Sequence, residues 1–164
     1  MKTIFGVAVT VYALTALPVC AGVPELLNAF GMFPLDAKVS ETRLRALCKT
    51  DSEDVGDAAY ICPDGLEYVV YGNAITTIRY RFVPTDANTS ILGVHAGDNE
   101  TTVVKHIADT YGVSLKKFRV ENWNVYATDM TTVESCGQKC DLNFSFAPNG
   151  LIAEITKEPE VPYE

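Results

Sequence analysis

The sequence predicts an α+β protein of two tandem repeats, each a helix followed by an antiparallel β-meander, with one disulfide inside each repeat. Two observations support this prediction. Residues 32–48 and 91–107 can be aligned, and in both segments an extended apolar stretch leads into a helix start. Each helix is then followed by β-rich runs that turn residues separate. The identity between the halves is low, so a single domain with two similar hairpins stays an open alternative.

The N-terminal residues 1–21 are typical of a secretory signal peptide. Lys2 precedes an apolar run at residues 4–17, and small residues follow near Ala21. We therefore expect cleavage after Ala21 and a secreted or periplasmic protein. An exported chain enters an oxidising compartment, where disulfides persist.

The first repeat is expected to span residues 22–83. The side chain of Ser40 can accept a hydrogen bond from the first amides of a helix, and Glu41 suits the positive end of that helix. The dipeptide Gly72–Asn73 predicts a two-residue hairpin, because glycine tolerates the positive φ that such turns require. The expected strands are residues 58–62, 66–71 and 74–83.

A linker at residues 84–90 leads to the second repeat, residues 91–158, which a short tail at 159–164 follows. The helix of this repeat is expected to begin at Asn99 and to end near Gly112, a residue suited to a left-handed cap. The expected strands are residues 122–128, 142–146 and 151–156, with a turn at Pro148–Gly150 between the last two.

Four cysteines remain once the signal peptide is removed, and four cysteines allow three pairings. Proximity in the sequence favours Cys48 with Cys62 and Cys136 with Cys140, one bridge in each half. A zinc site is disfavoured, because the second pair has three intervening residues and no second close pair accompanies it. We therefore expect neither a metal nor another cofactor.

Composition limits the partners of this chain. Its formal net charge is -8 at pH 7, and phosphate backbones and anionic lipid heads repel an acidic protein, so nucleic-acid binding is not expected. Beyond the signal peptide no apolar run approaches the roughly 20 residues of a membrane-spanning helix. A lipid anchor at Cys20 is an alternative to its removal with the signal peptide, but Pro18 and Val19 fit a lipoprotein signal poorly.

No catalytic motif stands out in the sequence. His106 falls inside the second helix and His95 in the loop before it, and neither has the context of a nucleophile elbow or a triad. A small extracytoplasmic hydrolase that uses His95 or His106 with carboxylates is the alternative to a binding protein. The carboxylates considered for it are Glu134, Asp141 and Glu154.

The strand faces turned away from the core are predicted to bind a protein partner. Side chains alternate along a strand, so if Ile78 points into the core, Thr77 and Arg79 point outward. By the same reasoning Trp123 and Val125 are expected to point inward. Tyrosine and arginine often dominate interfaces, although an ordinary solvated strand face could carry them too. The predicted partner face comprises Tyr71, Thr77, Arg79, Arg81, Asn124 and Tyr126.

A series of short motifs in the second half resembles a known group of small exported modules. These motifs are a glycine-led turn at residues 93–100, a helix end at Tyr111–Gly112 and an aromatic strand at Trp123–Tyr126. Their order is similar to that in the beta-lactamase inhibitory protein and the BamE (SmpA/OmlA) group, best over residues 91–156 and loosely over 31–83. The resemblance implies tandem modules and an exported binding role through an open sheet face. It does not imply inhibition of a β-lactamase, because no target-binding loop is matched.

Overall fold

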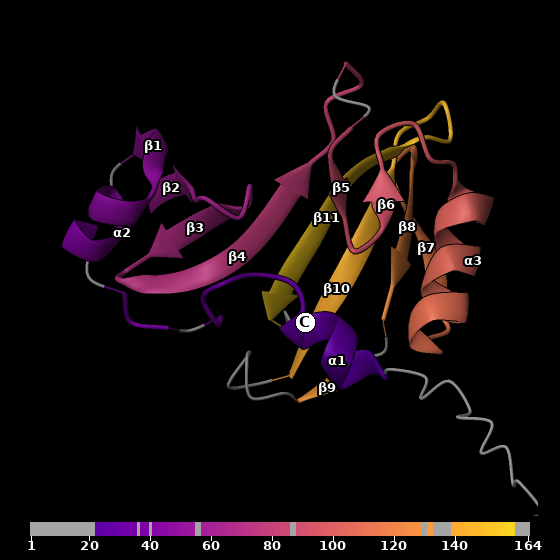
Figure 1. Cartoon of the computed structure of the whole chain (residues 1–164), viewed down its shortest axis with the longest axis horizontal. Helices are drawn as coiled ribbons and strands as arrows, with labels where there is room; N and C mark the ends of the chain where they lie inside the picture. Colours follow the sequence, from indigo (N-terminus) through magenta and orange to yellow (C-terminus); the bar gives the residue numbers. More distant parts are fainter. Residues whose placement is uncertain are drawn as a thin grey trace, which may run out of the picture.

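The computed structural model describes residues 22–35, 37–39, 41–54, 57–85, 88–128, 131–132 and 139–159. In this part of the chain most of the regular structure is antiparallel β-sheet (Figure 1). Three short helices accompany the sheet: α1 Val23–Asn28, α2 Glu41–Leu47 and α3 Glu100–Tyr111. None of the described helices is long and apolar enough to span a membrane. The predicted signal peptide and Cys20 lie outside the described residues.

Among the described residues one large sheet contains nine strands. Eight of them lie in the order β1-β2-β3-β4-β11-β10-β8-β7, and the ninth, β9, pairs with β10. All of these pairs are antiparallel. The strands are β1 Lys49–Asp54, β2 Asp57–Ile61, β3 Glu67–Tyr71, β4 Ala74–Arg81, β7 Lys116–Val120, β8 Trp123–Ala127, β9 Thr131–Thr132, β10 Lys139–Phe146 and β11 Ile152–Pro159. A small second sheet joins β5 Ser90–Ile91 to β6 Val94–His95.

The prediction of two helix-plus-meander repeats is wrong, because strands from the two halves join in one sheet. β4 from the first half pairs with β11 from the second, in a register that places Arg81 opposite Glu154 and Ile78 opposite Lys157. Figure 1 shows these two strands side by side. The sequence signals were local turns and local alternation, which cannot reveal a pairing between strands more than 70 residues apart.

Several local predictions are confirmed. Gly72 and Asn73 adopt positive φ angles of 55° and 74° in the turn between β3 and β4. The side chain of Asn99 accepts a hydrogen bond from the amide of Thr102 at the start of α3, and Gly112 ends that helix in the left-handed conformation. Caps and primed turns depend on a few adjacent residues, so they can be predicted from the sequence.

All three helices bury apolar residues in one core cluster on a single face of the sheet. The short helix α1, which the sequence analysis did not predict, contributes side chains with no exposed surface. Burying a leucine or phenylalanine side chain stabilises a fold by roughly 1.5–3 kcal/mol, so even this one short helix is firmly held. Buried members of the cluster include Leu26, Leu27, Phe30, Leu44, Tyr68, Ile78, Val103, Ile107, Phe144, Phe146 and Ile155.

A buried lysine also holds α1. Lys157 of β11 is 1% exposed, and its Nζ donates to the carbonyl oxygens of Leu27, at 2.7 Å, and Phe30, at 3.4 Å. The carbonyl groups at the end of a helix lack partners within the helix, and a cation is stabilised near them. The contact therefore ties the start of the described chain to its last strand.

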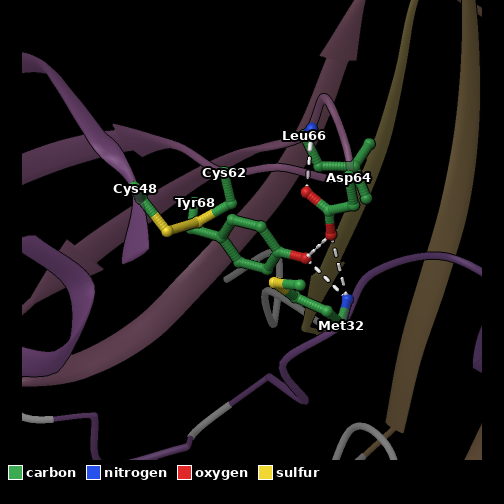
Figure 2. The surroundings of a disulfide bond; sticks show 6 residues. All are labelled: Met32, Cys48, Cys62, Asp64, Leu66 and Tyr68. Carbon is green, nitrogen blue, oxygen red and sulfur yellow. Dashed lines mark hydrogen bonds between the residues drawn. A yellow bond between two sulfur atoms is a disulfide. The ribbon is translucent and has the colours of Figure 1, made fainter. Parts of the chain in front are cut away.

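The predicted disulfide between Cys48 and Cys62 is confirmed (Figure 2). It joins the residue after α2 to the residue after β2. This is the one disulfide with both cysteines among the described residues, and Cys140 is also disulfide-bonded. Cys140 is buried in the core, and its predicted partner Cys136 lies outside the described residues.

A hydrogen-bonded tyrosine lies beside this disulfide (Figure 2). The hydroxyl of Tyr68 donates to the carboxylate of Asp64 and accepts a hydrogen bond from the Met32 amide at 2.6 Å. Asp64 also accepts from the amide of Leu66 at 3.1 Å, within the turn between β2 and β3. Burial, together with the Asp64 carboxylate, raises the pKa of Tyr68 above its ordinary value. The network fixes the segment after α1 to the β2–β3 turn.

Candidate binding surface

The sheet face that points away from the core cluster is the candidate binding surface, called the open face below. Residues directly opposite each other on paired strands share a face, so the register identifies its members. One row crosses five strands, from β4 through β11, β10 and β8 to β7. In that order its residues are Arg81, Glu154, Ser145, Val125 and Phe118.

Ion pairs occupy the centre of the open face. Arg79 binds Glu67 through two hydrogen bonds, Nε to Oε2 at 2.8 Å and Nη2 to Oε1 at 2.9 Å. These hydrogen bonds raise the pKa of the Arg79 guanidinium, and Glu67 is buried beneath it. The contacts of Arg81 are looser, at 3.6 Å to Glu67 and 3.8 Å to Glu154, and its side chain is 57% exposed. The side chain of Arg79 is therefore fixed within the fold, whereas the exposed side chain of Arg81 can contact a partner protein.

Exposed apolar side chains gather where β7 and β8 meet. Phe118, Val120 and Trp123 are 44%, 54% and 37% exposed, although each is large and apolar. Val120 lies opposite Trp123, and Phe118 lies opposite the buried Val125, so all of them belong to the open face. We call Phe118, Val120 and Trp123 the hairpin patch. Clustered aromatic and apolar side chains of this kind are typical of interaction sites.

The hairpin patch was not predicted from the sequence. No strand was expected at residues 116–120, although basic and apolar residues alternate there as they do in an exposed strand. Trp123 was expected to point inward from the alternation along its strand alone. In the structure Trp123 lies on the open face, opposite Val120 of the edge strand β7.

Asn124 and Tyr126 lie on the opposite face from the one predicted. Tyr126 pairs with Phe144 of β10, and its ring packs edge-on against Phe146 at 5.6 Å, on the core side. A shift of one residue exchanges the two faces of a strand. Both faces of β8 carry apolar residues, so the alternation did not fix its orientation. The other predicted residues, Tyr71, Thr77, Arg79 and Arg81, do share the open face.

Asn124 and Tyr126 hold the β7–β8 hairpin to α3. The carboxylate of Glu100 accepts hydrogen bonds from Asn124 Nδ2 at 2.6 Å, Tyr126 Oη at 2.9 Å and Lys117 Nζ at 3.0 Å. These hydrogen bonds, that from Asn124 above all, lower the pKa of Glu100. The ammonium of Lys117 also lies 5.2 Å from the centre of the Tyr126 ring. Asn124 and Tyr126 thus position the hairpin patch from behind.

The two histidines are held by local contacts in α3 and in the loop before it. His106 Nε2 lies 2.9 Å from the Leu92 carbonyl oxygen, to which it must donate, and Nδ1 lies 3.4 Å from Thr110 Oγ1. Both ring nitrogens of His106 therefore have partners in the loop and the helix. His95 is exposed, with Nδ1 3.7 Å from Asp98. Within the described ranges no group of three or more His, Cys, Asp or Glu side chains could hold a metal ion.

Comparisons of this chain with protein-family models, with curated proteins and with solved structures found no match. The resemblance to the beta-lactamase inhibitory protein and the BamE group therefore stays a prediction. Function is inferred from the open face and the hairpin patch themselves.

Proposed function

We propose that this chain is an exported protein-binding module and that its partner contacts the open face. The observation that carries this proposal is the row from Arg81 to Phe118, which begins at a loosely held arginine and ends in the hairpin patch. Four strand spacings of about 4.8 Å make it roughly 19 Å long, which suits a standard protein interface. Arginine and aromatic residues are also the side chains that most often anchor such interfaces.

The exported location is part of this proposal. The predicted signal peptide supports it, and the Cys48–Cys62 disulfide is what an oxidising compartment would maintain. The partner is then an extracytoplasmic protein that offers an apolar side chain to the hairpin patch and a carboxylate to Arg81. The hydrolase alternative, with His95 or His106, gains no comparable support from the described residues.

Affinity capture with open-face variants tests this function. The purified chain is immobilised and exposed to the extracytoplasmic fraction of its source, and captured proteins are compared among wild type, Trp123→Ala, Arg81→Ala and Lys105→Ala. Lys105 is the control, because it lies on α3 and its partner among the described residues is the exposed Asp109 of the same helix. A genuine partner should be retained about tenfold less by the Trp123 or Arg81 variant and equally by the control. Equal capture by all four proteins would contradict the proposal.

A further inference from the structure

The hairpin patch borders a free edge of the sheet. β7 pairs with β8 on one side, and no described strand pairs with it on the other. All five residues of β7 are exposed. An edge strand of this kind presents backbone N–H and C=O groups with which another chain can pair.

The register of the hairpin identifies the backbone groups that face outward. A two-residue loop, Glu121–Asn122, joins Val120 to Trp123, and residues that flank such a loop exchange backbone hydrogen bonds. Hydrogen-bonded and non-hydrogen-bonded pairs alternate along an antiparallel ladder. The N–H and C=O groups of Lys117 and Arg119 therefore point away from β8, toward the free edge.

β7 is basic although the chain is acidic. Three of its five residues are Lys116, Lys117 and Arg119, while the whole chain carries a formal net charge of -8. Lys117 and Arg119 share one face of the strand, and Phe118 and Val120 share the other. The contacts of Arg119 among the described residues use Nε alone, which donates to the Glu121 carbonyl oxygen at 3.1 Å. Its remaining N–H groups are thus available to a carboxylate.

We propose that β7 receives an extended segment of the partner protein as an added strand, and that acidic residues alternate with apolar residues in this segment. Residues opposite each other on paired strands share a face. Acidic residues of the segment would therefore lie opposite Lys117 and Arg119, and apolar residues would lie opposite Phe118 and Val120. This inference depends on the proposed protein-binding function and adds where the partner binds and what its sequence contains.

A second copy of this chain fits β7 less well than such a segment. The other edge of the sheet, β1, is acidic, but its residues Lys-Thr-Asp-Ser-Glu-Asp include no apolar side chain to cover the hairpin patch. A register shift between Thr50 and Ser52 also interrupts β1. Irregular edges of this kind protect a sheet from edge-to-edge association.

Two synthetic peptides of about nine residues test the inference with the full chain. One alternates Glu with Val, and the control alternates Lys with Val. Trp123 is the one tryptophan of the chain and lies in the hairpin patch, so its emission reports binding there. We expect the Glu–Val peptide to bind at least about tenfold more tightly than the Lys–Val peptide. Exchange of the Lys117 and Arg119 amide hydrogens should slow by about tenfold or more at saturation.

A charge reversal at the edge provides the matched variants. Arg119→Glu should weaken the Glu–Val peptide by about tenfold or more, because it opposes the acidic residues directly. Arg45→Glu makes the same change in net charge on α2, which lies at the other end of the sheet in Figure 1, and should leave the affinity within about twofold. Circular dichroism confirms that both variants fold.

Three results would overturn the inference. The first is equal binding of the two peptides, and the second is binding that leaves the β7 amides unprotected. The third is protection of these amides in the free chain together with dimers in light scattering, which would make a second copy the occupant. If neither peptide binds while Trp123→Ala still abolishes partner capture, strand addition fails and the proposed function of the open face stands.

Discussion

Arg79 and Arg81 lie two positions apart on β4 and share a face, yet their surroundings assign them different roles. Arg79 neutralises the buried Glu67 through two hydrogen bonds, so its removal would leave this carboxylate with the looser contact to Arg81 at 3.6 Å. We expect Arg79→Ala to lower the free energy of unfolding by about 1–3 kcal/mol, and Arg81→Ala to lower it by less than about 0.5 kcal/mol. Urea denaturation measures both values. Equal losses would show that Glu67 does not depend on Arg79.

Lys157 makes the free energy of unfolding depend on pH. Burial lowers its pKa from 10.5 to about 8 in the folded chain. Between pH 8 and 10.5 the unfolded chain therefore binds more protons than the folded chain, so the free energy of unfolding should rise with pH across this window. Tyr68 acts in the opposite direction above about pH 10, because its pKa is raised on folding.

The variant Lys157→Met isolates the contribution of Lys157. Wild type should gain roughly 2–3 kcal/mol relative to this variant between pH 8 and 10.5, since a pKa difference of one unit corresponds to about 1.4 kcal/mol. Only the slope of the pH profile tests the titration, because at pH 7 the desolvation of the ammonium and its hydrogen bonds to the carbonyls of Leu27 and Phe30 act in opposite directions. Parallel pH profiles for the two proteins would mean that the ammonium is not desolvated.

At the scale of single elements, the Cys48–Cys62 disulfide connects α2 to the β2 hairpin. It closes a loop with a sequence separation of 14 residues. Changing both cysteines to Ala should lower the free energy of unfolding by about 2–4 kcal/mol, as the loop-closure model gives for this length. Urea denaturation of the double variant measures the loss. Free thiol at either position in the non-reduced wild-type chain, detected by mass spectrometry, would contradict the pairing.

The loop before α3 offers a prediction with a matched control. Gly93 has a φ of 76°, and a Cβ there would collide with the imidazole of His106, which binds the neighbouring Leu92 carbonyl. Gly97 also has positive φ, 91°, but apart from its chain neighbours no described residue comes within 4 Å of its Cβ position. Gly93→Ala should therefore destabilise the chain by about 2 kcal/mol more than Gly97→Ala, which adds only backbone strain of about 1–2 kcal/mol. Thermal denaturation compares them, and equal losses would show that His106 moves aside freely.

Elements with a clear local signal could be predicted from the sequence, and elements with an ambiguous one could not. The cap at Asn99 and the turn at Gly72–Asn73 require particular residue types at particular positions, so both were found. The orientation of β8 depends on which of its faces is covered, and Trp123 and Tyr126 are equally good core residues by type. The orientation is decided by tertiary packing, which buries Phe144 and Phe146 in one core cluster with Val103 and Ile107 of α3 and turns Tyr126 toward that cluster.

For the whole molecule, the pairing of β4 with β11 determines the shape of the binding surface. Without it, Arg81 and the hairpin patch would lie on separate sheets, and the row that joins them would not exist. The sequence identified Arg81 as exposed but could not place it beside residues of the second half. Long-range strand pairing depends on the packing of both faces and both edges, which no local pattern specifies.

The continuous sheet predicts that the two halves unfold together. β4 and β11 are hydrogen-bonded neighbours, and Lys157 of β11 holds α1, so neither half can separate without exposing core residues of the other. Ile107→Ala, deep in the second half, should lower the free energy of unfolding by about 2–5 kcal/mol. Two probes follow the halves separately: the emission of Trp123 in urea, and the exchange rate of the Tyr68 amide in β3. Both should report the same loss, because a cooperative fold shares any local destabilisation. If Tyr68 kept its wild-type exchange rate while the Trp123 transition moved, the halves would be independent units despite the shared sheet.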